Sequence, residues 1–284
     1  MEFILNEESL KGQFTTVQDF LKSLKSNIRC FHIIRKSEHN TISKIDNFYD
    51  CYVTSDIRIR DLHNCPCSDE LVAFQYQLEQ EIYNLPHWDK NPMHDLSKAY
   101  LLEESDMVAT GIAEATERDH LLLSFDMEKF KDCTLHIQAA DREELVSSIY
   151  SPAFLVECVG KQLGIHGDDI LKIRYEGTRI DCSSIEMKYG TEILNENQLQ
   201  QIISSMDKFV KHETWENIDR DDGLEYKKYT PDSPKHNWYN GSMYRDKQIM
   251  KFRASSLLRV HGYRKGDKFR VLRFETDHKQ SDHG

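Results

Sequence analysis

Residues 257–274, which we expect to form a β-hairpin, read LLRVHGYRKGDKFRVLRF. Apolar and polar residues alternate on both sides of the RKGDK turn, which is typical of two antiparallel strands. The period of two places three functional side chains on one face of the first strand, namely Arg259, His261 and Tyr263. The second strand adds Arg270 or Arg273 to that face, and the register of the pair decides which.

The hairpin belongs to a basic segment. Residues 224–284 hold 14 Lys and Arg against 7 Asp and Glu, a net charge of +7, whereas the rest of the 284-residue chain has a net charge of −18. This asymmetry predicts a basic surface for a polyanion beside an acidic body. We therefore expect an α+β protein in three parts: a mixed α/β body at 1–212, an acidic linker at 213–223 and a smaller basic α+β module at 224–284.

Hydrophobic periodicity gives the elements of the body. It predicts helices at 15–25, 69–84, 111–118 and 153–163, and a longer helix that begins at Asn195. Runs rich in β-branched and apolar residues predict strands at 28–34, 51–53, 57–59, 121–125, 134–139, 170–175 and 179–182.

Aromatic residues are interleaved with the basic residues of 224–284, as in proteins that grip single-stranded nucleic acid. We expect RNA or DNA as the partner, and the candidate binding residues are Lys251, Arg253, Tyr263, Arg270 and Lys279. The alternative is that about half of the aromatic residues form a small core and the cations form a solvated face, or dock on the acidic body.

The same face also holds a set of groups that is able to cleave RNA without a metal or other cofactor. A base takes the proton of a 2′-hydroxyl, arginines stabilise the charged phosphorane, and an acid protonates the leaving oxygen. The candidate catalytic residues are His278, His261, Arg259 and Arg273. The alternative is an ordinary basic hairpin.

Two segments resemble known proteins. The run from Lys251 to Lys279 resembles the terminal strands of RelE-like toxins, which are small α/β ribonucleases. The resemblance implies that His278 is a general acid or base and that Arg259 or Arg273 binds phosphate. The segment from Gly111 to Phe125 resembles uncharacterised proteins of bacterial mobile elements and phage-defence loci.

Three other clusters contain metal-ligating or titratable side chains. His63, Cys65 and Cys67 offer metal-ligating atoms, but their spacing is tighter than in a usual zinc site, so a plain loop is the better interpretation. His87, His94 and Asp95 lie in a proline-flanked loop. The acidic helix face with Glu114, Glu117, Arg118 and Asp119 is a third candidate, for a metal-dependent nuclease or a solvated surface.

The composition indicates where in the cell we expect the protein to be located. Mean hydropathy is −0.65 and no apolar run is long enough to cross a bilayer. Seven scattered cysteines and an acidic start predict a cytoplasmic protein. Our leading hypothesis is a toxin-like or phage-defence effector whose basic module binds nucleic acid and cleaves RNA. The alternative is a non-catalytic adaptor of a bacterial defence complex, with a protein partner bound through the acidic body or the basic module.

Overall fold

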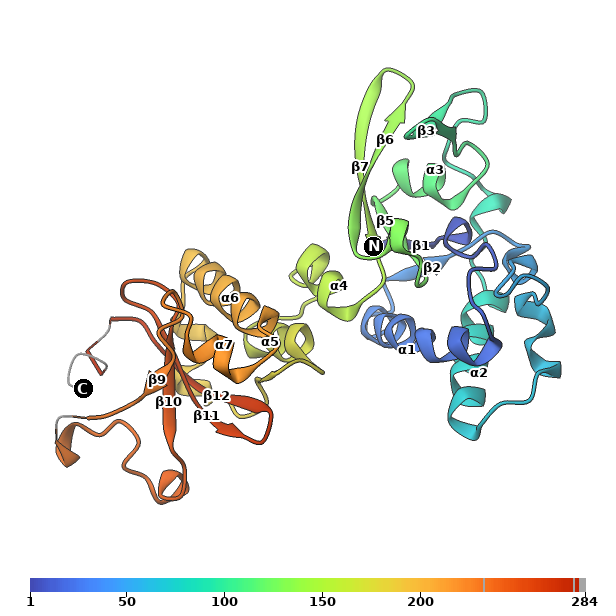
Figure 1. Ribbon diagram of the computed structural model, residues 1–284. Helices are drawn as coiled ribbons and strands as arrows, with labels where there is room; N and C mark the ends of the chain where they lie inside the picture. The colour runs from blue at the N-terminus through green and yellow to red at the C-terminus, as the bar shows by residue number, and fades with distance from the viewer. Residues whose placement is uncertain (232, 278, 281–284) are drawn as a thin grey trace. The chain divides into compact units, whose positions relative to one another are not determined.

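The computed structural model describes residues 1–231, 233–277 and 279–280. The chain divides into two compact units, residues 1–163 and 164–284. Each unit contains a β-sheet with helices packed on it, so the predicted α+β class is confirmed (Figure 1). The division falls between Leu163 and Gly164, which corrects the predicted boundary at 213–223. The reason is that residues 164–212 supply helices to the core of the second unit.

The N-terminal unit contains a seven-stranded sheet with the order β2-β1-β5-β7-β6-β3-β4. The first four strands in this order are parallel, and the last three add antiparallel pairs. The strands are β1 (Glu2–Leu5), β2 (Thr41–Ser43), β3 (Tyr100–Leu102), β4 (Ser105–Asp106), β5 (Leu121–Leu123), β6 (Cys133–Ala139) and β7 (Arg142–Ile149). The helices are α1 (Val17–Ile34), α2 (Asp69–Tyr83), α3 (Gly111–Thr116) and α4 (Pro152–Val159).

Both faces of this sheet are covered. Phe3 and Leu5 of β1 point to one face and join a core with residues of α1, α2 and α4. Ile4 points to the other face and packs with residues of α3. Strands that are buried on both faces have continuous apolar sequences, which explains the run Leu121-Leu122-Leu123 in β5.

Helix α1 corrects one prediction. Thr16 caps it by accepting a hydrogen bond from the Asp19 N–H, as expected, but the helix continues to Ile34. The predicted strand at 28–34 is its second half, because Ile28, Phe31 and Ile34 continue the buried stripe at helical spacing. The predicted strands at 51–53 and 57–59 contribute only isolated bridges and the start of a 3₁₀ turn.

The C-terminal unit contains a five-stranded sheet with the order β8-β12-β11-β10-β9. The strands are β8 (Ile180–Asp181), β9 (Lys227–Lys228), β10 (Ile249–Arg253), β11 (Arg259–Lys265) and β12 (Lys268–Glu275). The predicted hairpin is β11 and β12. The helices are α5 (Asp168–Tyr175), α6 (Glu196–Lys211) and α7 (Trp215–Asp219), and they pack on one face of the sheet. Helix α6 begins after Asn195 as predicted, whereas α5 replaces the strand predicted at 170–175.

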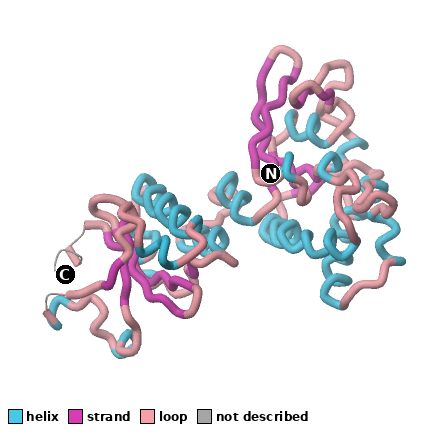
Figure 2. The backbone as a smooth tube through the Cα atoms, in the orientation of Figure 1, coloured by secondary structure: helices cyan, strands magenta, loops and turns pink. Residues whose placement is uncertain are grey.

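The other face of this sheet is covered by the segment from Tyr229 to Gln248. This segment is mostly loop with two short 3₁₀ turns (Figure 2). Its Tyr229, Tyr239 and Tyr244 are buried and form a small core with Ile249 and Leu272. The sheet therefore has apolar contacts on both faces.

A β-bulge between His261 and Gly262 sets the register of the hairpin. A Cβ atom at Gly262 would lie 2.8 Å from the Phe269 ring and even closer to the Arg270 carbonyl oxygen. We expect Gly262→Ala to lower the free energy of unfolding by roughly 1–3 kcal/mol, because the neighbouring strand has to move. Urea denaturation tests this, with Gly241→Ala as the control, since a Cβ at Gly241 meets only ordinary contacts. Equal effects of the two variants would contradict the prediction.

Within the described residues, none of the helices has both the length and the apolar composition that a membrane crossing requires.

Candidate nucleic-acid interface

The register of the C-terminal sheet brings the predicted site residues onto one face. Lys251 pairs with His261, and His261 pairs with Arg273, so these three form a row across three strands. The next row consists of Arg253, Arg259 and Glu275. The bulge also pairs Tyr263 with Arg270, so Arg270 and Arg273 both lie on this face. The predicted shared face of Arg259, His261 and Tyr263 is confirmed.

Most of this face is in the interior of the unit. His261 is fully buried, and the exposed fractions of Lys251, Arg259 and Arg273 are 2%, 4% and 8%. The cover is the segment 229–248, whose Trp238 and Tyr239 rings lie 5.2 and 5.9 Å from the His261 ring. The rows therefore do not form an open surface along which a nucleic acid is able to lie.

His261 is held by Glu275. The distance from its Nε2 atom to the Glu275 carboxylate is 2.8 Å. Burial lowers the pKa of His261 and outweighs the opposite effect of the Glu275 hydrogen bond, so the imidazole is neutral at pH 7. A neutral imidazole oriented by a carboxylate has the chemistry of a general base, but here it lies in the core.

The two buried arginines hold loops in place. Arg259 donates from Nη1 to the carbonyl oxygens of Ser255 and Leu258, at 2.6 and 2.8 Å, and so stabilises the turn before β11. Arg273 pairs with Glu186 at 2.8 Å. Its guanidinium also lies 4.5–5.2 Å from the centroids of four rings, those of Tyr189, Trp238, Tyr239 and Tyr244. Catalytic roles for these residues stay predictions, and His278 lies outside the described residues.

The remaining candidate binding residues are more exposed. Arg253 forms an ion pair with Glu225, and Arg270 pairs with Asp181 at 3.4 Å. Lys279 is exposed and pairs with Asp277 at 2.7 Å. Tyr263 is half-buried at the end of β11, where the Lys247 ammonium lies 5.2 Å from its ring centroid.

Tyr263 and Arg264 mark a cationic region at the turn of the hairpin that the sequence did not single out, with Arg264 on the face that the helices cover and Tyr263 on the opposite face. We call it the hairpin end and define it by the residues Trp215, Lys247, Tyr263, Arg264, Lys265 and Lys268. The Arg264 guanidinium lies 4.0 Å from the Trp215 ring centroid. Lys265 is exposed at the turn, directly opposite Lys268. Asp267 is the acid at this turn, and it accepts a hydrogen bond from the Trp215 indole at 2.8 Å.

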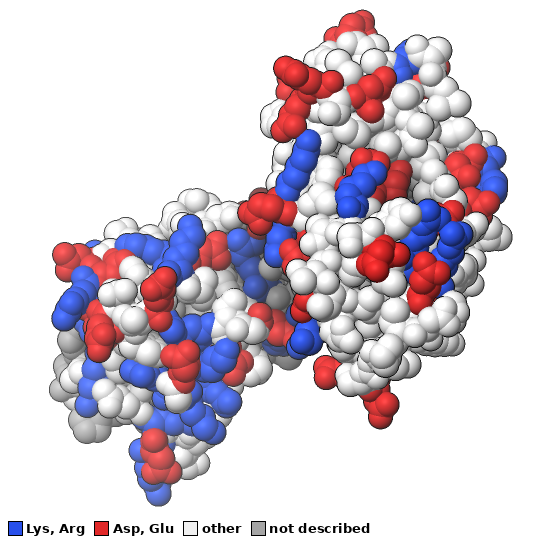
Figure 3. All heavy atoms as spheres, turned by 45° about the vertical axis from the view of Figure 1, so that its right-hand side comes forward, with Lys and Arg blue, Asp and Glu red and all other residues white. Residues whose placement is uncertain are grey.

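The charge of the C-terminal unit differs from that of its last segment. Residues 164–284 together hold 21 Lys and Arg against 20 Asp and Glu, a net charge of +1, whereas residues 1–163 have a net charge of −12. The acids of 164–223 fold with the basic hairpin and pair with it, as in Arg270 with Asp181 and Arg273 with Glu186. Figure 3 shows Lys and Arg side chains gathered on this unit with Asp and Glu between them.

No family model, curated protein or solved structure matches this chain. The resemblances to RelE-like toxins and to proteins of phage-defence loci stay predictions that rest on the residues quoted for them.

The N-terminal unit brings together two clusters that are separate in the sequence. His94 and Glu114 are both buried, and the His94 Nδ1 atom lies 2.5 Å from the Glu114 carboxylate. Arg118 donates to Glu114 as well and also pairs with Glu2. Glu114 therefore serves as an internal anchor. Among the described residues, we find no three His, Cys, Asp or Glu side chains placed to hold a metal, His63, Cys65 and Cys67 included.

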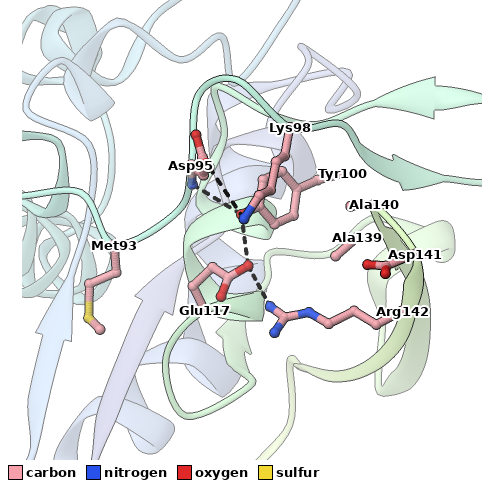
Figure 4. A pocket seen from close by; sticks show the side chains of 9 residues that line it. All are labelled: Met93, Asp95, Lys98, Tyr100, Glu117, Ala139, Ala140, Asp141 and Arg142. Carbon is pink, nitrogen blue, oxygen red and sulfur yellow. Dashed lines mark hydrogen bonds and ion pairs between the residues drawn. The ribbon is translucent and has the colours of Figure 1, made fainter.

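Glu117 points into a separate cavity of about 190 Å³. Figure 4 shows it between Tyr100 and Arg142. It accepts hydrogen bonds from the Tyr100 hydroxyl at 2.7 Å and from Arg142 at 2.6 Å. Asp119 instead accepts the Glu2 N–H at 2.7 Å. The carboxylates of Glu114, Glu117 and Asp119 thus have different partners and do not converge on one point.

Proposed function

We propose that the C-terminal unit binds single-stranded RNA at the hairpin end. The observation that carries this proposal is the pairing of half-buried rings with cations there, Arg264 with Trp215 and Lys247 with Tyr263. Rings at a rim support stacked bases, while adjacent cations contact the phosphates.

The exposure of the cations favours the hairpin end, rather than the buried rows, as the binding site for RNA. Arg264 and Lys265 are exposed, and Lys247 and Lys268 are partly exposed, so a phosphate is able to reach them without displacing the covering segment. Arg259, His261 and Arg273 instead maintain the sheet that presents the hairpin.

RNA cleavage, a toxin-like role in phage defence and the cytoplasmic location stay predictions. Incubation of the protein and its His278→Ala variant with RNA in excess chelator tests the first of them.

Binding of a labelled oligouridylate at increasing potassium chloride concentration tests the proposal. We expect Arg264→Ala and Lys265→Ala each to weaken binding at low salt by roughly 3- to 10-fold, and to reduce the slope of log affinity against log salt by about 0.7. The reason is that binding of each variant releases fewer counterions from the RNA than binding of the wild type does.

The matched control is Lys188→Ala. Lys188 is also exposed, but it precedes Tyr189, whose ring contacts Arg273, and Arg273 pairs with His261 rather than with the residues of the turn. Equal losses in all three variants would indicate diffuse charge attraction and contradict a defined site. Binding that does not change with salt would contradict the proposal and favour the adaptor hypothesis.

A further inference from the structure

The carboxyl ends of β1 and β2 border a crevice in the N-terminal unit. The connection from β1 to β2 contains α1, which packs on one face of the sheet, whereas α3 precedes β5 on the other face. The connection that leaves β1 thus covers one face of the sheet, and the last helix of the connection that leaves β2 covers the other, so the covered face changes between these two neighbouring strands. In parallel sheets of this kind, ligands bind outside the carboxyl ends of the strands at such a point.

A cavity of about 370 Å³ lies in this crevice. Its walls come from the residues after β1, the residues after β2 and the residues before α3. Leu10, Ile45 and Tyr52 provide apolar surface, and Glu7 and Asp50 provide carboxylates. The volume is within the range of small-molecule sites.

Glu7 has an unusual position in the cavity wall. Its Oε1 atom accepts the Gly111 N–H at 2.6 Å. Its Oε2 atom is buried and has no hydrogen-bond partner among the described residues. Gly111 permits this approach, since a Cβ there would lie 2.8 Å from Oε2. Burial raises the pKa of Glu7 to about 7, so both the protonated and the charged form of its carboxyl are present near neutral pH.

The charged neighbours of Glu7 already have partners. On its own segment, Lys11 pairs with Glu8 at 2.7 Å. On the segment after β2, Asp50 pairs with Arg60 at 2.6 Å and with Arg58 at 3.3 Å. Burial raises the pKa of the Cys51 thiol to about 12, so it stays neutral. A buried carboxylate without a cation is costly, and a bound cation would remove that cost.

We propose that this crevice binds a small organic ammonium compound. The ammonium group of the ligand forms an ion pair with the Glu7 carboxylate, and its apolar part packs against Leu10, Ile45 and Tyr52. The proposal is independent of RNA binding by the C-terminal unit.

Isothermal titration calorimetry of the full chain with benzylammonium tests this inference, and benzyl alcohol is the neutral probe of similar shape. We expect benzylammonium to bind and benzyl alcohol to bind at least tenfold more weakly. Below about pH 7 the affinity for benzylammonium should fall about tenfold per pH unit, because the cation competes with the proton on Glu7. Binding below this pH should also release a proton to the buffer.

Two variants complete the test. Glu7→Gln keeps an oxygen for the Gly111 N–H but removes the charge, so we expect at least a tenfold loss of affinity and no pH dependence. Glu143→Gln removes an exposed carboxylate of β7 that pairs with His136 and is not among the residues lining this cavity, so it should leave the affinity within about twofold. Circular dichroism confirms that both variants are folded. Absence of benzylammonium binding, or equal binding by Glu7→Gln and the wild type, would overturn the proposal.

Discussion

Replacement of Arg273 by alanine is expected to lower the free energy of unfolding of the C-terminal unit by about 3–5 kcal/mol. Arg273 is 8% exposed, pairs with Glu186 and is surrounded by four aromatic rings. Its loss leaves the Glu186 carboxylate without its cation and empties the space between the rings. The covering segment 229–248 then loses the contact between its aromatic residues and β12.

Urea denaturation of the full chain measures this effect, with tryptophan fluorescence as the signal because Trp238 contacts the guanidinium directly. The matched control is Arg264→Ala. Arg264 also lies over a tryptophan ring, but it is exposed, so its loss should cost about 1 kcal/mol or less. Arg273→Lys retains the charge without the planar fork and should recover less than half of the loss. Equal effects of the two alanine variants would show that burial of Arg273 does not stabilise the unit.

Replacement of Glu114 by alanine is expected to lower the free energy of unfolding of the N-terminal unit by about 3–5 kcal/mol. The carboxylate is fully buried and accepts hydrogen bonds from the Met93 N–H at 3.1 Å, from His94 and from Arg118. The variant leaves the Arg118 guanidinium, which is largely buried, with Glu2 as its remaining carboxylate partner among the described residues. Chemical denaturation followed by circular dichroism tests this, and Glu117→Ala is the control, because Glu117 is more exposed and should cost about 1 kcal/mol.

The pH dependence of this effect has a defined sign. Burial raises the pKa of Glu114, but the hydrogen bonds from His94, Met93 and Arg118 outweigh it, and the net pKa is below the ordinary value of 4.5. The stabilisation is therefore complete above about pH 4.5 and is lost as the pH falls through the lower pKa of the folded state. The difference between wild type and Glu114→Ala should shrink in acid. A difference that grows as the pH falls would contradict the assigned charge.

Local patterns predicted several elements correctly. Helices α2 and α6 have regular apolar stripes, and the hairpin has a clear period of two. Their secondary structure therefore follows from local sequence and does not depend on distant residues. The strands expected at 28–34 and 170–175 are helical. Short apolar runs fit either structure, and only the packing of α1 on the sheet and of α5 in the second core distinguishes them.

The candidate site was predicted in part. Sequence period alone placed Arg259, His261 and Tyr263 on one face, and the strand register confirms it. It did not indicate the hairpin end, because Trp215 and Lys247 reach Arg264 and Tyr263 from distant segments. It also did not indicate Glu7, because the burial of that carboxylate comes from the start of α3, about a hundred residues later in the chain.

The sequence by itself determined which side chains of the first hairpin strand share a face, because alternation along a strand follows from backbone geometry. It also determined the +7 charge of residues 224–284. Only the tertiary structure decided that this face is interior and that this charge is largely neutralised. Both outcomes depend on residues distant in the chain: the segment 229–248 excludes solvent from His261, and the acids of 164–223 pair with the arginines of β12.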